Sequence, residues 1–176
     1  LALVSVLEAA GHARAAARAA AALTKKHGHS CKAWLCRHGL ALRQGDAAGA
    51  VACLKAAAVA TPARKHAKLL SRAAVAEFRG GNQEAGRALF ERLLAAAPKR
   101  LDLWSVYIDQ EVKAGDAARV RALLARGAAA DLPPKKAKFL FRRALDFEKA
   151  VGDEARVEAV RAAARAYVAR VGGGGQ

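Results

Sequence analysis

Apolar residues recur at helical spacing along this chain, and glycines interrupt the pattern at regular intervals. Small and apolar positions return in the same register after successive interruptions, at residues 51–54, 88–90 and 122–124. The interruptions are spaced 34, 36, 34 and 37 residues apart, at Gly11, Gly45, Gly81, Gly115 and Gly152. We expect each glycine to close one helix in the left-handed conformation, and the Asp or Asn that follows four of them to cap the next helix. The pattern therefore predicts a series of helix pairs.

A period near 34 residues with two helices in each unit is typical of the tetratricopeptide class. Such units bury their apolar faces only against neighbouring units, so we predict an all-α fold, an α-solenoid of tetratricopeptide-like helix pairs. About four and a half pairs fit into residues 1–171, and a flexible glycine-rich tail is expected at 172–176. The chain lacks an initial Met and opens inside a helical pattern, so we expect it to be a fragment of a longer protein.

Two positions stand out when the units are aligned on their glycines. Eleven residues before the glycine, a large apolar residue is expected to anchor the core: Trp34, Leu70, Trp104 and Phe141. Four residues before it, three of the units carry an acid: Glu77, Glu111 and Glu148. A residue seven positions after the anchor lies near the same helix face, so the Glu can reach a neighbouring helix. Equally, it can be a solvated acid near a helix end.

The candidate chemistry is sparse. Cys31, Cys36 and Cys53 are an odd number without a secretion signal, which favours free thiols in a reducing compartment. Their spacing relative to His29 and His38 matches no common zinc site, so we expect no metal. The serines have no glycine elbow, and no phosphate loop is present. We therefore expect no enzyme activity, cofactor or small-molecule substrate, and no membrane span, since no apolar run approaches about 20 residues.

Charge is distributed unevenly. The formal net charge is +16, and residues 9–76 hold twelve Lys or Arg against one acid, Asp46. Such an excess attracts polyanions, so this half is expected to bind RNA or an acidic protein, unless it is simply a solvated face. A second basic cluster begins a predicted helix, where positive charge opposes the helix dipole, although Asp131, Asp146 and Glu148 can balance it. The candidate binding residues are Arg64, Lys65, Lys68, Arg72, Lys135, Lys136, Lys138, Arg142 and Arg143.

Several stretches resemble a known repeat. Residues 103–109 (LWSVYID) with Glu111, preceded by 88–92 and 98–100, resemble the half-a-tetratricopeptide (HAT) repeat, which is frequent in RNA-processing proteins. Further stretches are similar to the carboxy-terminal HAT region of the large eukaryotic rRNA-biogenesis factor, whose amino-terminal part is an array of OB-type RNA-binding domains; they are 98–108, 134–143 and 145–149.

This resemblance implies a non-catalytic scaffold in the small-subunit preribosome of the nucleolus, needed for pre-rRNA cleavage. Its implied partners are preribosomal proteins and pre-rRNA or small nucleolar RNA. Two other functions stay open. The chain can be a HAT scaffold in splicing or mRNA 3′-end processing, or a stand-alone basic RNA-binding module. The last predicts salt-sensitive RNA binding by this chain alone.

Overall fold

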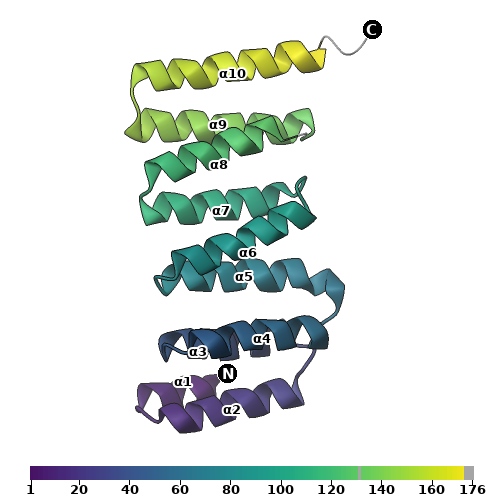
Figure 1. Cartoon of the computed structure of the whole chain (residues 1–176), viewed down its shortest axis with the longest axis vertical. Coiled ribbons are helices and arrows are strands. Elements are labelled where there is room, and N and C mark those ends of the chain that lie inside the picture. Colours follow the sequence, from purple (N-terminus) through teal and green to yellow (C-terminus); the bar gives the residue numbers. More distant parts are fainter. Residues whose placement is uncertain (131, 173–176) are drawn as a thin grey trace. The chain divides into compact units, whose positions relative to one another are not determined.

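A computed structural model describes residues 1–130 and 132–172. The part described is built from ten α-helices and one 3-10 turn, η1, which directly precedes α5 (Figure 1). This confirms the predicted fold class. The elements are α1 (Ala2–Ala9), α2 (Ala13–Lys26), α3 (Cys31–Arg43), α4 (Ala47–Ala60), η1 (Ala63–Lys65), α5 (His66–Arg79), α6 (Gln83–Ala96), α7 (Leu101–Ala114), α8 (Ala117–Ala129), α9 (Pro134–Val151) and α10 (Glu154–Gly172). The predicted tail lies outside the described residues from position 173 onward.

The turn glycines mostly behave as predicted. Gly11, Gly45, Gly81 and Gly115 have φ between +72° and +84°, the left-handed region that glycine adopts without steric cost. Gly152 does not, because its φ is −99° and its backbone is extended while its N–H still donates to the Glu148 carbonyl. The left-handed prediction is therefore wrong at this turn.

Aspartates cap three of the second helices. The carboxylate of Asp46 accepts from the Gly49 N–H at 2.7 Å, and that of Asp116 accepts from the Arg119 N–H at 3.1 Å. Asp153 does the same for α10, at 2.8 Å from the Arg156 N–H. Each cap satisfies a backbone donor that has no partner within its own helix, which fixes where the second helix of the pair begins.

The helices fall into two compact units, residues 1–93 and 94–176. In the first unit, α1 packs on α2, α2 on α3, α3 on α4, and α5 on α3. Its core is built from small residues and single large ones, such as Ala16 and Ala20 with Leu40. In the second unit, α8 lies between α7 and α9, and α9 packs on α10. Short side chains let neighbouring helices approach closely, which explains how an alanine-rich chain still forms a core.

The predicted anchor position is right in two units and displaced in two. Trp34 and Trp104 are buried, and each indole N–H donates to a carbonyl six residues earlier. Leu70 and Phe141 are only half-buried, while the residue before each is fully buried: Leu69 and Leu140. Both positions lie on the core side of the helix, so the rotation of the helix about its axis decides which of the two residues is buried as the anchor.

The recurrent glutamates are buried, which decides between the two interpretations of their position. Glu77, Glu111 and Glu148 are 5%, 1% and 6% exposed. Glu148 of α9 accepts two hydrogen bonds from the Arg121 guanidinium of α8, at 2.8 and 3.0 Å. The acid therefore joins its helix to the preceding pair, as one of the two interpretations predicts.

Glu77 has a different partner. Its Oε1 lies 3.1 Å from Nε2 of His38 on α3, and its Oε2 accepts from the Asn82 amide at 3.1 Å. Val51 stands at the position equivalent to Arg121, six residues after the turn glycine, so no guanidinium is supplied from α4. His38 replaces it from α3. Burial lowers the pKa of His38 and raises the pKa of Glu77.

All three cysteines are free thiols. Cys53 is buried against Trp34, and burial raises the pKa of its thiol to about 11, so it behaves as a small core residue. Cys31 and Cys36 are half-buried. Within the described ranges, no three His, Cys, Asp or Glu side chains gather as a metal site would require.

Candidate nucleic-acid interface

Cations gather at one end of the helix pairs in the first unit. α2 ends with Lys25 and Lys26, and Lys32 lies in the first turn of α3. Arg64 and Lys65 form η1, and Lys68 lies in the first turn of α5. We call this set the lysine edge: Lys25, Lys26, Lys32, Arg64, Lys65 and Lys68.

A hydrogen bond brings the two parts of the lysine edge together. Lys65 Nζ donates to the His29 carbonyl at 3.2 Å, which joins the start of α5 to the loop before α3. The ring Nδ1 of His29 also lies 2.9 Å from the Ala60 carbonyl, at the end of α4. Segments more than 30 residues apart in sequence therefore present their cations side by side.

The lysine edge is solvent-accessible and has no internal counter-charge. Five of its six side chains belong to exposed residues and Lys65 is half-buried. Within residues 1–130 and 132–172, none of the six forms an ion pair with a carboxylate. The one acid between residues 9 and 76, Asp46, caps α4 at the opposite, turn end of its helix pair. The fold thus separates the charges, leaving one end cationic.

Helix geometry adds to the positive potential. α3 and α5 both begin at this edge without an acidic residue in their first turn and without a side-chain cap. The helix dipole places partial positive charge at this end of both helices, although carbonyls of residues 62 and 63 already accept from the Lys65 and His66 N–H groups before α5. Cations placed here raise the free energy of the folded chain slightly, and a bound anion offsets that increase. Phosphate groups are well suited, because helix starts and Lys side chains both bind them.

The predicted residues of the first half lie on one face. Arg64, Lys68 and Arg72 are four residues apart and all exposed, so they form a row that begins at the lysine edge and continues along α5. Sequence reasoning did not single out Lys25, Lys26 and Lys32. Lys32 could have been found by the same alignment on the turn glycines, because it precedes Gly45 by 13 residues as Lys68 precedes Gly81.

The second cluster lies on α9 in the second unit and repeats one feature of the first. Lys136 Nζ donates to the Lys99 carbonyl at 2.6 Å. Lys65 and Lys136 both precede their turn glycine by 16 residues, and each contacts the carbonyl of the equivalent residue one unit earlier. Lysine at this position therefore ties successive first helices together.

The remaining members of the second cluster differ in their surroundings. Lys135, Lys138 and Arg142 are exposed. Arg143 instead forms an ion pair with Asp109 of α7 at 2.5 Å, so its charge is compensated within the fold. Asp146 is exposed one turn after Arg142, whereas Glu148 is committed to Arg121. Asp131 lies outside the described residues. The second cluster is thus a smaller and partly compensated basic surface.

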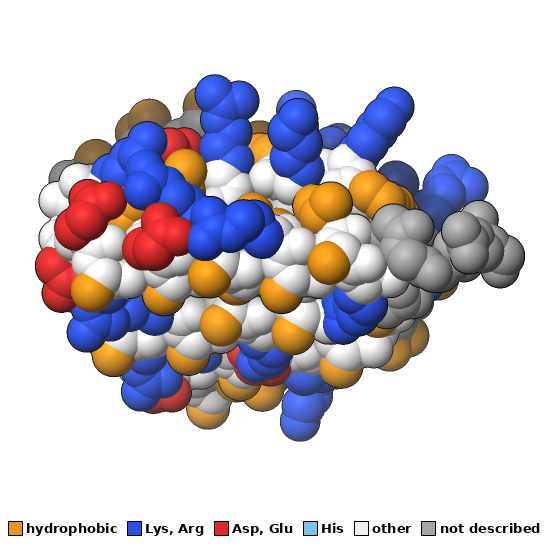
Figure 2. All heavy atoms as spheres, turned by 90° about the horizontal axis from the view of Figure 1, so that it is seen from above, with side chains coloured by type: hydrophobic (Ala, Val, Ile, Leu, Met, Phe, Trp, Pro, Cys, Tyr) orange, Lys and Arg blue, Asp and Glu red, His pale blue; other side chains and the backbone are white. Residues whose placement is uncertain are grey.

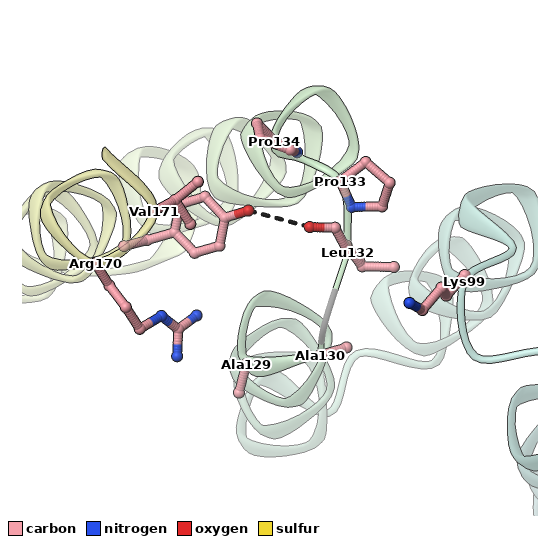
Figure 3. A pocket seen from close by; sticks show the side chains of 9 residues that line it. Lys99, Ala129, Ala130, Leu132, Pro133, Pro134, Arg170 and Val171 are labelled. Atoms are coloured by element: carbon pink, nitrogen blue, oxygen red, sulfur yellow. Dashed lines mark hydrogen bonds between the residues drawn. The ribbon is translucent and has the colours of Figure 1, made fainter. Parts of the chain in front are cut away.

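A hollow of about 390 Å³ lies beside this second cluster. It is bounded by the end of α8, the segment before α9 and the end of α10, with Lys99 and Arg170 on opposite sides (Figure 3). The Tyr167 hydroxyl donates to the Leu132 carbonyl at 3.1 Å and fixes one wall. The Tyr167 ring is not free for stacking, because Arg170 covers it at 5.5 Å and Phe141 packs against it at 5.6 Å.

No family model matches this chain, but individual proteins are similar to it in sequence. Residues of the chain are 42% identical to "rRNA biogenesis protein RRP5" of Arabidopsis thaliana over 167 residues, which is 95% of this chain and 9% of that protein. Its homologues are RRP5 rRNA biogenesis proteins.

Other homologues agree. The RRP5 protein of Schizosaccharomyces pombe is 45% identical over 107 residues, covering 61% of this chain and 6% of that protein. The mouse RRP5 homologue is 38% identical over 135 residues, which is 77% of this chain and 7% of that protein. The chain therefore spans less than a tenth of the length of the curated relatives it matches. None of the helices among the described residues is long and apolar enough to cross a membrane.

Proposed function

We propose that this chain is a non-catalytic scaffold module that acts in pre-rRNA processing and ribosome assembly, within the small-subunit preribosome of the nucleolus. The printed names of the RRP5 homologues support a role in rRNA biogenesis. The helix-pair fold supports the scaffold part, because such repeats offer long surfaces for partners. In this proposal the chain corresponds to the carboxy-terminal HAT region of a longer parent that also carries OB-type RNA-binding domains.

The lysine edge is the proposed RNA contact of this module. The observation that carries this proposal is a set of six cations from two neighbouring segments without a carboxylate partner in the described structure. Contacts of this kind are made to phosphates and release counterions, so they supply affinity and position without reading sequence. The RNA is pre-rRNA or small nucleolar RNA, and the sequence specificity comes from other parts of the parent or from preribosomal proteins.

The second cluster has a lesser role in this proposal. Lys135, Lys138 and Arg142 add to the field, but Arg143 is paired with Asp109 and Asp146 lies nearby. Opposite charges close to a basic surface reduce the potential that a phosphate experiences, and salt screens what remains beyond about 8 Å. We therefore assign the main RNA contact to the first unit.

The test uses the full-length parent in cells. A tagged wild-type parent and a variant with Lys32→Glu, Arg64→Glu and Lys68→Glu are purified, and the bound RNA and proteins are identified. The proposal expects small-subunit preribosomal proteins and pre-rRNA with the wild type, and less pre-rRNA with the variant. A parent that is purified instead with splicing or mRNA 3′-end processing components would contradict the assignment to ribosome assembly.

A further inference from the structure

A groove runs between α8 and α10, with α9 as its floor. It consists of two adjoining hollows of about 260 and 380 Å³, which share Ala125, Ala128, Phe141 and Ala163. On α10 the residues lining it recur at spacings of three and four from Arg156 to Arg170, so they form one continuous stripe. The span from Arg156 to Arg170 is 14 steps of about 1.5 Å along the helix, so the groove is about 21 Å long.

Alanines lie on both walls of the groove. Ala125 on α8 faces Ala159 and Ala163 on α10, and Phe141 of α9 lies between them. These alanines are exposed to solvent. Their side chains end at Cβ, which lets another backbone come close, while Leu124, Val160 and Tyr167 add larger side chains to the lining. Figure 2, seen from the α10 end, shows short apolar side chains between Lys and Arg groups, with acids gathered near the start of the helix.

Cations mark both ends of the groove. Arg121 and Arg156 line one end and Arg170 lines the other. Arg121 is compensated by Glu148, the only acid in the lining of these two hollows. Arg156 is 3.8 Å from the exposed Asp153, a weak pair, and Arg170 has no carboxylate partner within the described residues. The groove is therefore positive at its Arg170 end, whereas Glu148 and Asp153 offset the two cations at the other end.

We propose that this groove binds one helix of a partner protein, with a stripe of small and apolar residues about 15 residues long and acids near the end that meets Arg170. Amphipathic helices bind apolar grooves through side chains at i, i+3, i+4 and i+7, and a groove about 21 Å long holds about four turns of such a helix. Acids at one end of such a helix reach Arg170. This deepens the proposed scaffold role and rests on it, since it states the kind of partner that the scaffold holds.

Charge argues against a second copy of this chain as the occupant. Two copies placed groove to groove bring Arg156 or Arg170 of one copy close to the same cations of the other, in either orientation. Like charges at an interface cost free energy. Glu148 is already held by Arg121, and Asp153, which lies outside the lining, offsets Arg156 but not Arg170. A partner helix with acids avoids this repulsion between cations.

The first test measures peptide binding by the 176-residue chain. The probe is a fluorescent 16-residue peptide with Ala and Leu at groove-facing positions and two Glu at each end; the control peptide has Lys in place of Glu. Binding is measured by fluorescence anisotropy in low and moderate salt. We expect the acidic peptide to bind at least about tenfold more tightly than the basic one, because Arg170 at one end of the groove has no carboxylate partner among the described residues. Equal affinities, or no binding of the acidic peptide, would overturn the proposal.

Matched variants locate the binding site. Ala125→Leu with Ala163→Leu fills the groove from exposed positions, while Ala122→Leu with Ala162→Leu adds the same bulk at exposed positions of α8 and α10 outside the groove lining. Arg156→Glu with Arg170→Glu reverses the end charges, and Arg161→Glu with Arg165→Glu makes the same change of net charge outside the lining. We expect each groove variant to weaken acidic-peptide binding by about tenfold or more, and the matched controls to change it less than about twofold.

Two results would contradict the groove assignment. One is an equal loss of binding in the matched controls. The other is a concentration-dependent dimer, detected by sedimentation, that disappears when the groove is filled, because the occupant would then be a second copy. RNA binding of the same variants is measured in parallel. Loss of peptide binding with normal RNA binding isolates the groove, whereas normal peptide binding with no RNA binding refutes the RNA contact and leaves the groove intact.

Discussion

Nε2 of His38 lies 3.1 Å from Oε1 of Glu77, in a buried contact that links α3 to α5. The other ring nitrogen, Nδ1, is buried without a hydrogen-bond partner in the described structure. With the ring neutral and its proton on Nε2, the ring donates to the carboxylate and leaves only a lone pair unsatisfied. Protonation would place a second N–H on Nδ1, where no acceptor lies. This geometry agrees with the lowered pKa of His38.

The pair predicts a pH dependence. Because the pKa of His38 is lower in the folded chain than the usual 6.5, the unfolded chain takes up a proton first as the pH falls. The free energy of unfolding should therefore decrease from about pH 6.5 downward. His38→Gln keeps a donor but does not titrate, so its unfolding free energy should fall less steeply between pH 6.5 and 5.5. Urea unfolding at several pH values measures both slopes.

Glu77 affects the pH dependence of the free energy of unfolding in the opposite direction. Its pKa is raised by burial, so it lowers stability as the pH rises above about 4.5, where the unfolded chain ionises first. The comparison of wild type with His38→Gln at each pH separates the histidine from this effect and from the other histidines. Parallel pH profiles for the two proteins would contradict the assignment to His38.

Trp104→Ala should destabilise the chain by about 3–5 kcal/mol, because it removes a buried indole from the core and leaves a cavity. Trp104 is 3% exposed and its N–H donates to the Pro98 carbonyl at 2.8 Å. The measurement is denaturant unfolding. Phe139→Ala is the control, since Phe139 is 36% exposed, and its cost should be well below that of Trp104→Ala. A loss below about 1 kcal/mol for Trp104→Ala would mean that the indole does not anchor the core.

Glu148→Ala should cost about 2–3 kcal/mol, because it removes two charge-assisted hydrogen bonds and leaves Arg121 without its partner in a half-buried position. Asp146→Ala, on an exposed position of the same helix, should change the unfolding free energy by less than about 0.5 kcal/mol. Equal effects of the two substitutions in urea unfolding would show that the Arg121 contact does not stabilise the link between α8 and α9.

The periodic features of the fold can be predicted from the sequence, whereas local rotations and pairings cannot. Turn glycines and caps act within a few residues, so Gly45-Asp46 and Gly115-Asp116 behave as predicted. Gly152 fails because glycine tolerates the extended conformation as readily as the left-handed one. The shift of the anchor from Leu70 to Leu69 depends on helix rotation, which neighbouring side chains decide.

The candidate site, too, could be predicted from the sequence only in part. The excess of positive charge in the first half is visible in the composition, and Arg64, Lys65 and Lys68 were found from it. That Lys25 and Lys26 lie at the same end as Arg64 requires knowledge of how the pairs stack. That Arg143 is paired with Asp109, 34 residues earlier, also depends on packing between helices. Sequence spacing alone carries no signal for either.

Salt-dependent RNA binding of two matched triple variants tests the central claim most directly. One reverses the exposed residues Lys32, Arg64 and Lys68 to Glu, and the other reverses Lys135, Lys138 and Arg142; Lys65 and Lys136 stay because they join helices. Both variants change the net charge equally, and thermal unfolding checks that both fold.

The wild-type chain should bind single-stranded RNA with log K falling by about 3–4 for each tenfold rise in salt, if four to six cations contact phosphates. The lysine-edge variant should lose about two units of that slope and bind at least about tenfold more weakly at 0.1 M salt, while the α9 variant should change affinity by less than about threefold. An equal or greater loss in the α9 variant, or no loss in either, would contradict the account.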